Sequence, residues 1–196
     1  RLLYTLLSNG KHPEERSELY ALVVWLVQLG LDTHDLVDNH SGKRPEREMR
    51  ARQILVLAGN YFSSRFYHLL SQAGQIEMIG RISRAVCEVN RLKMSLYARS
   101  KQRKVTADEY IGIHTRLKSG LFELFESLLD DRVKAIYPDL LHGFTRCEVV
   151  LDELRRMDSP GRFEGSWGYW LILQDGTEEE RRQLTQHPPE EGLIRQ

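Results

Sequence analysis

The chain has 196 residues, of which 41% are hydrophobic, and its 28 Lys and Arg residues are balanced by 28 Asp and Glu residues. This length and composition predict one all-α domain over residues 1–196 with a substantial buried core. The balanced charge excludes an overall electrostatic attraction to nucleic acid or to an anionic membrane.

The apolar segments and the cysteines are informative about compartment. The longest apolar run, 19–27, is far shorter than the roughly 20 residues that span a bilayer, so it predicts a buried helix and no transmembrane segment. Cys87 and Cys147 lie in apolar helical patterns without C-x-x-C spacing, so we expect reduced core thiols. The first residues lack the pattern of a secretory signal. Together these features indicate a cytoplasmic protein.

Apolar residues recur with three- and four-residue steps along most of the chain, which predicts helices throughout. Capping boxes at Thr106–Glu109 and Thr177–Glu180 each predict a helix start. We expect helices at residues 2–8, 14–29, 31–39, 46–72, 76–100, 107–130, 132–136, 139–157, 166–174 and 178–186.

Three of these helices carry a continuous apolar stripe, which is the pattern of an amphipathic helix. The stripes consist of Ile79, Ile82, Val86, Val89, Leu92 and Leu96; of Tyr110, Ile113, Leu117, Leu121, Leu124 and Leu128; and of Leu140, Phe144, Cys147, Leu151 and Leu154.

Two short segments carry the candidate chemistry. His34-Asp35-Leu36-Val37-Asp38-Asn39 resembles the H-D-D-x-x-D motif of trans-isoprenyl diphosphate synthases, and Leu57-Ala58-Gly59-Asn60-Tyr61 resembles their L-A-G-D-Y/F element. In that family the carboxylates share a helix face and hold Mg²⁺ ions, which neutralise the leaving diphosphate. Here Leu36, Asn39 and Asn60 replace acids of the two elements. The resemblance therefore implies a relative that has lost its metal ligands, although the small Ala58 and Gly59 still permit close helix packing.

Two later segments extend the resemblance. Residues 110–122 resemble the family's Y-x-x-x-I-x-x-K-T-A-x-L-F helix, which implies a diphosphate-contacting role for Lys118. Residues 143–153 echo the second aspartate motif, but Arg155 and Arg156 occupy the region of its third acid.

The resemblance covers roughly residues 19–157, and with the helix 88–97 it is closest to component 1 of heptaprenyl diphosphate synthase. That family implies a truncated isoprenoid synthase fold and a non-catalytic subunit without a cofactor of its own. The implied partner, catalytic component 2, carries Mg²⁺ and both aspartate motifs. The heterodimer is expected to elongate farnesyl diphosphate with isopentenyl diphosphate for the menaquinone side chain, and this subunit to help set product length.

The resemblance also places two functional regions. Gly30, Leu31, Asp35 and Lys118 form the expected substrate or product-length region, because the missing side chain one turn before Asp35 leaves room for an apolar tunnel. An equally simple interpretation of Gly30 is a helix terminus.

The expected partner interface includes Tyr61, Phe62 and Phe66. We expect the partner to cover the apolar faces of helices 54–70 and 76–96, because obligate interfaces resemble a protein core cut in two. Aromatic residues at this helical spacing are also compatible with packing inside the chain.

Two other functions are open at this stage. His34, Asp35, Asp38 and His40, with His12 and Asp152, loosely resemble the ligands of helical HD-type phosphohydrolases. Such an enzyme binds a transition metal and hydrolyses phosphate esters as an isolated chain. A helical interaction scaffold would do neither, and would not restore long-chain condensation with a catalytic component.

Overall fold

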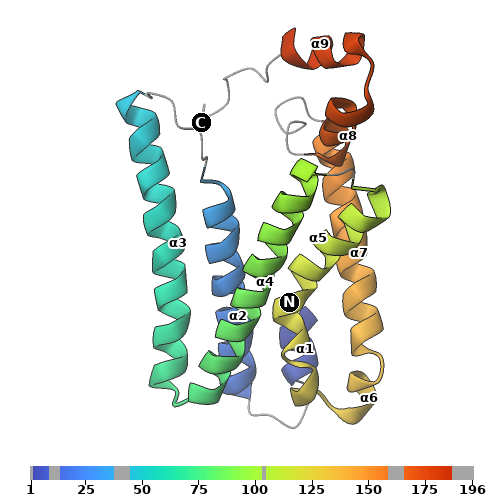
Figure 1. Ribbon diagram of the computed structural model, residues 1–196. Coiled ribbons are helices and arrows are strands. Elements are labelled where there is room, and N and C mark those ends of the chain that lie inside the picture. The colour runs from blue at the N-terminus through green and yellow to red at the C-terminus, as the bar shows by residue number, and fades with distance from the viewer. Residues whose placement is uncertain (1, 9–13, 38–44, 103–104, 159–165, 187–196) are drawn as a thin grey trace. The chain divides into compact units, whose positions relative to one another are not determined.

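The computed structural model describes residues 2–8, 14–37, 45–102, 105–158 and 166–186 (Figure 1). These residues form helices joined by turns and contain no strand, which confirms the all-α prediction. They fall into two compact units, one made of Arg1–Cys87 with Gly120–Pro138 and the other of Glu88–Ser119 with Asp139–Gln196. The expectation of a single domain over 1–196 stays a prediction.

The first unit is built on α1 (Leu2–Ser8), α2 (Glu14–Asp35), α3 (Glu46–Gln72) and the beginning of α4 (Ile76–Gln102). It also contains the 3-10 helix η1 (Glu126–Leu128) and the short α6 (Asp131–Lys134). Tyr20 joins α2 to the turn before α4, because its hydroxyl donates to Gln75 Oε1 at 2.7 Å. The fully buried core side chains of this unit include Leu7, Val23, Val24, Leu70, Ile82, Leu121, Phe125 and Tyr137.

A glycine turn connects α3 to α4. Gly74 has φ +66°, a left-handed conformation that glycine adopts without a steric cost. The Gly74 amide donates to the Ser71 carbonyl at 3.0 Å, and the Gln75 amide donates to the Leu70 carbonyl at 2.8 Å. This pair of bonds is the Schellman motif, which satisfies the last carbonyls of α3 and allows α4 to begin at Ile76.

The second unit contains the end of α4, most of α5 (Ala107–Glu123) and most of α7 (Tyr137–Met157), followed by α8 (Trp167–Asp175) and α9 (Glu178–Gln186). Both predicted capping boxes are confirmed. Before α5, the Glu109 amide donates to Thr106 Oγ1 at 3.2 Å and the Thr106 amide donates to Glu109 Oε2 at 3.1 Å. The equivalent bonds between Thr177 and Glu180 start α9, at 3.2 and 2.7 Å.

Two predicted helix boundaries are wrong. The expected break at Gly30 is absent, because α2 continues through it to Asp35. The expected helix 107–130 ends at Glu123, and a turn with η1 follows. The Tyr137 hydroxyl donates to the Phe122 carbonyl at 3.0 Å, so a side chain satisfies one of the last carbonyls of α5.

The three apolar stripes differ in burial. Ile79, Ile82 and Val89 of the first stripe and Leu117 and Leu121 of the second are buried. On α7, all five residues of the third stripe are exposed, and the buried face consists of Leu141, Thr145, Val149 and Glu153.

Both cysteines are free but exposed, so the expectation of core thiols is wrong. Cys147 belongs to the exposed stripe of α7, and Cys87 points away from the buried residues of α4. Within the described ranges, no helix combines the length and apolar character that crossing a membrane requires.

Candidate functional site

The resemblance motifs meet where α2 crosses α3. Gly30 and Gly59 are both buried there. A Cβ atom at Gly59 would lie 2.6 Å from the His34 ring, and one at Gly30 would lie 3.2 Å from Ser63 Oγ and 3.4 Å from the Gly59 carbonyl oxygen. These neighbours show that the helices run antiparallel, since His34 lies beside Gly59 while Gly30 lies beside residues 62–63. The close packing predicted from Ala58-Gly59 is confirmed.

The crossing changes the structural interpretation of Gly30. Gly30 lies inside α2, and α3 occupies the space that its missing side chain leaves. It therefore serves helix packing rather than forming a helix end. Leu31 is half-buried and Asp35 is the exposed last residue of α2. The product-length role of Gly30, Leu31 and Asp35 stays a prediction.

The degenerate aspartate motif does not fit a magnesium site in the part of the chain that the structure describes. Asp35 is followed by the exposed Leu36, and Asn60 is an exposed amide on α3. No three His, Cys, Asp or Glu side chains among the described residues are placed to hold a metal ion. Asp38 and Asn39 lie outside the described residues, as do His12 and His40 of the HD-type alternative.

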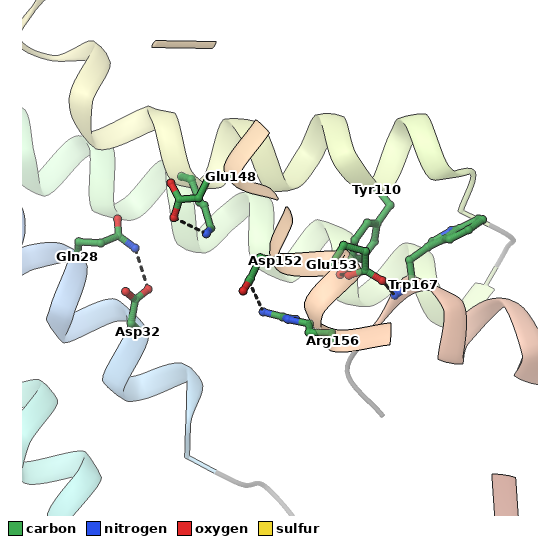
Figure 2. Close-up of polar contacts among 9 residues, drawn as sticks. Gln28, Asp32, Tyr110, Glu148, Asp152, Glu153, Arg156 and Trp167 are labelled. Carbon is green, nitrogen blue, oxygen red and sulfur yellow. Dashed lines mark hydrogen bonds and ion pairs between the residues drawn. The ribbon is translucent and has the colours of Figure 1, made fainter. Parts of the chain in front are cut away.

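The second unit contains a polar network that joins α5, α7 and α8 (Figure 2). Glu153 is buried, with 9% of its surface exposed, and its carboxylate accepts from the Tyr110 hydroxyl at 3.2 Å and from the Trp167 amide at 2.5 Å. The Trp167 indole donates to the Val105 carbonyl at 3.1 Å. Ser166 caps α8 by accepting from the Tyr169 amide at 3.0 Å. Glu153 therefore helps to hold the start of α8 on the other two helices.

The acids that echo the second aspartate motif have structural partners. Asp152 pairs with Arg156 at 3.1 Å along α7, while Glu148 pairs with Lys118 of α5 at 2.9 Å (Figure 2). Together with the bonds of Glu153, these contacts engage three carboxylates in helix packing. Lys118 is one-third exposed, and its predicted diphosphate contact stays a prediction. It belongs to the second unit, whereas Gly30, Leu31 and Asp35 belong to the first.

His114 lies beside this network, with its ring centroid 4.2 Å from that of Tyr110. Burial lowers the pKa of His114 to about 4, and the positive charges of Arg156, Lys118 and Lys93 add to this effect. Burial and the nearby Glu153 carboxylate raise the pKa of Tyr110. His114 is consequently neutral and Tyr110 protonated at neutral pH, which suits a packing role.

The three residues of the predicted partner interface do not share one environment. Tyr61 is 62% exposed on α3. Phe62 and Phe66 are half-buried, and Phe62 Cβ lies on the side of α3 that approaches Gly30. The predicted face of α4 is already covered within the chain, because Ile79, Ile82 and Val89 are buried. Of the three residues Tyr61, Phe62 and Phe66, Tyr61 is the most accessible.

The expected interface included helix 54–70 as a whole and did not name Ile54–Leu57, which is the most exposed apolar turn of α3. Ile54 and Leu57 are 64% and 65% exposed, and Val56 is also exposed. The signal was present in the sequence, since four successive apolar residues on a helix point in four directions at about 100° intervals. A single neighbouring helix cannot cover all of them.

The comparisons with known proteins agree with the resemblance found in the motifs. The model of the family described as heptaprenyl diphosphate synthase (HEPPP synthase) subunit 1 matches residues 1–143, which include the whole α2–α3 crossing. The chain belongs to this family. The match therefore covers the whole first unit and, of the second unit, residues 88–119 and the beginning of α7.

A curated relative is similar over part of this region. It is heptaprenyl diphosphate synthase component 1 from Geobacillus stearothermophilus, which is 33% identical over 98 residues. The match covers 50% of this chain and 42% of the relative. No solved structure matches the chain.

Proposed function

We propose that this chain is the non-catalytic, regulatory subunit of a heterodimeric all-trans-polyprenyl diphosphate synthase, with heptaprenyl diphosphate as its product. The catalytic component would supply Mg²⁺ and both aspartate motifs, and would use farnesyl and isopentenyl diphosphates. The reaction would provide the menaquinone side chain in the cytoplasm. Membership in the subunit 1 family supports this proposal.

The observation that carries the proposal is the contrast between packing and ligands at the α2–α3 crossing. Gly30 and Gly59 pack closely. Leu36 and Asn60, however, occupy positions at which the motifs of trans-isoprenyl diphosphate synthases, which this chain resembles, have acids. An aliphatic side chain and a neutral amide cannot supply the charge that a hard cation and a diphosphate require. A chain of this kind can support a catalytic partner but lacks the means to ionise an allylic diphosphate itself.

Reconstitution tests the proposal. The purified chain is mixed with a candidate catalytic component from the same genome, and products of farnesyl diphosphate and labelled isopentenyl diphosphate are separated by length. We expect a heptaprenyl product from the mixture and none from this chain alone. Elongation by the solitary chain would contradict the proposal, and so would a catalytic component whose product length and rate are unchanged by this chain.

A further inference from the structure

Among the described residues, the N-terminal half of α3 is more exposed than the rest of the helix. His34, the penultimate residue of α2, lies beside Gly59, so α3 residues before 59 continue past the end of their antiparallel neighbour (Figure 1). Among residues 46–57 only Leu55 is half-buried and the others are exposed. Leu55 shares a helix face with Gly59 and Phe62, which is the face that approaches α2.

This exposed part contains the turn Ile54–Leu57, which is apolar in every direction. A helix that is hydrophobic all round is normally buried. Here Ile54, Val56 and Leu57 point away from the face of Leu55 and are exposed. The turn therefore has the composition of a core segment, although three of its four residues are exposed in the described part of the chain.

Other exposed apolar stripes of the chain differ in this respect. On α7, the exposed stripe that contains Leu151 lies opposite a buried face that contains Val149, so that helix is amphipathic in the usual way. On α2, the exposed Trp25 likewise alternates with the buried Val23 and Val24.

Charge on the same face of α3 indicates what kind of surface would cover the turn. A seven-residue spacing places Arg47, Ile54 and Tyr61 on one face of α3, and Arg65 follows Tyr61 by one turn. The exposed apolar residues of this face therefore have an arginine on each side along the helix. A complementary partner would present an apolar helix face with carboxylates at both ends.

The same charges disfavour a second copy of this chain as the occupant. In an antiparallel pair of α3 helices, Arg47 of one copy would oppose Arg65 of the other. In a parallel pair, each arginine would oppose its own equivalent. Both arrangements place like charges together, which is unfavourable at an interface.

We propose that Ile54, Leu57 and Tyr61 of α3, with the flanking Arg47 and Arg65, are the docking site for an amphipathic helix of the catalytic component that has acidic residues at both ends. We call this set of residues the α3 docking surface. The inference rests on the proposed function, because it takes the second component as the occupant. It keeps Tyr61 of the expected interface and replaces the half-buried Phe62 and Phe66 by Ile54 and Leu57, which are exposed on the same helix.

The first test is the substitution Leu57→Glu, with Leu151→Glu on the exposed stripe of α7 as the matched control. Both leucines are more than half exposed, so both full-length variants should keep the wild-type helical circular dichroism. Titration against the catalytic component should show at least a thirtyfold weaker Kd for Leu57→Glu, as expected for a central apolar contact. The control should change Kd less than threefold.

A second pair of variants keeps the test valid if Leu57→Glu does not fold. Arg65→Glu should weaken binding at low salt about tenfold and reduce the salt dependence of the Kd, since it places like charges together. Arg155→Glu, on an exposed position of α7, is its control and should have no such effect.

The outcomes separate the inference from the proposed function. Failure of the wild-type chain to bind any catalytic component would count against the proposed function. Binding that withstands Leu57→Glu and Arg65→Glu, or that is lost with the α7 variants instead, would overturn only the α3 docking surface. The inference would also be overturned if Leu57→Glu abolished sedimentation with phosphatidylglycerol vesicles, or a self-dimer, while leaving the heteromer intact.

Discussion

The α2–α3 crossing can be tested through the coupling between His34 and Gly59. Replacing glycine by alanine inside a helix normally stabilises it by about 1 kcal/mol. At Gly59 the new Cβ would lie 2.6 Å from the His34 ring, well inside the separation of about 3.5–4.0 Å that non-bonded atoms prefer. The nearest atoms are the tip of the half-buried His34 side chain, so the ring can rotate away from the new methyl group and lose its own packing, at a cost of about 1 kcal/mol. We therefore expect Gly59→Ala to leave the free energy of unfolding nearly unchanged, because this cost offsets the gain in helix propensity.

The same substitution should become stabilising once the ring is removed. In a His34→Ala background, Gly59→Ala should stabilise the chain by about 1 kcal/mol, so the coupling between the two positions should be about 1 kcal/mol. Urea unfolding of the four full-length proteins, followed by circular dichroism, gives this coupling from the four midpoints. If Gly59→Ala were stabilising by the same amount in both backgrounds, the close approach of His34 to Gly59 would be refuted.

Three further predictions concern pH, the polar network and activity. Burial lowers the pKa of His114 to about 4, below its usual 6.5, so the folded state favours the neutral imidazole. The stability that results is complete above pH 6.5 and is lost as the pH falls. This contribution should fall by up to about 1.4 kcal/mol per pH unit between pH 6.5 and 4. Urea midpoints of His114→Gln should lack that part of the pH slope, and equal slopes would contradict the assignment. Glu153→Ala removes the acceptor of two donors, Tyr110 and Trp167, and should lower the free energy of unfolding by about 3 kcal/mol. Chemical unfolding and a changed tryptophan emission would show this effect. An unchanged midpoint would argue against the network. Asp35→Ala should lower the turnover of the heteromer far less than loss of an aspartate in the catalytic component, and abolished turnover with the heteromer intact would disprove this.

Local signals in the sequence predicted much of the helical architecture. The bounds of α3 and α9 match the predicted 46–72 and 178–186 because a proline, a glycine turn and a capping box act within a few residues of each helix end. Gly30 misled the prediction, because a glycine can serve either a helix end or a close helix crossing. Only the position of α3 distinguishes these two roles.

The choice of inner face on α7 depended on information that a single sequence does not contain. The stripe of Leu140, Phe144 and Leu151 is more apolar than the face that includes Thr145 and Glu153, yet the second face is buried. Thr145 satisfies its hydroxyl by donating to the Leu141 carbonyl at 2.7 Å. Glu153 has donors from two other helices, so its burial depends on neighbours distant in the chain.

The candidate site was predicted in part. The replacement of acids by Leu36 and Asn60 was visible in the sequence and led to the family that the comparisons then showed. The orientation of Tyr61 relative to Phe62 and Phe66 was not visible, because neighbouring positions on a helix differ by about 100° and the direction of α2 was unknown.

The uncovered apolar turn of α3 has a consequence for how cells would handle this polypeptide. Exposed segments of core-like composition promote aggregation and draw chaperones and proteases. Chain produced in excess of the catalytic component would be degraded or would precipitate. The amounts of the two components in the cell should therefore rise and fall together. Co-expression should then raise the recovered amount of this chain, even with no change in its synthesis.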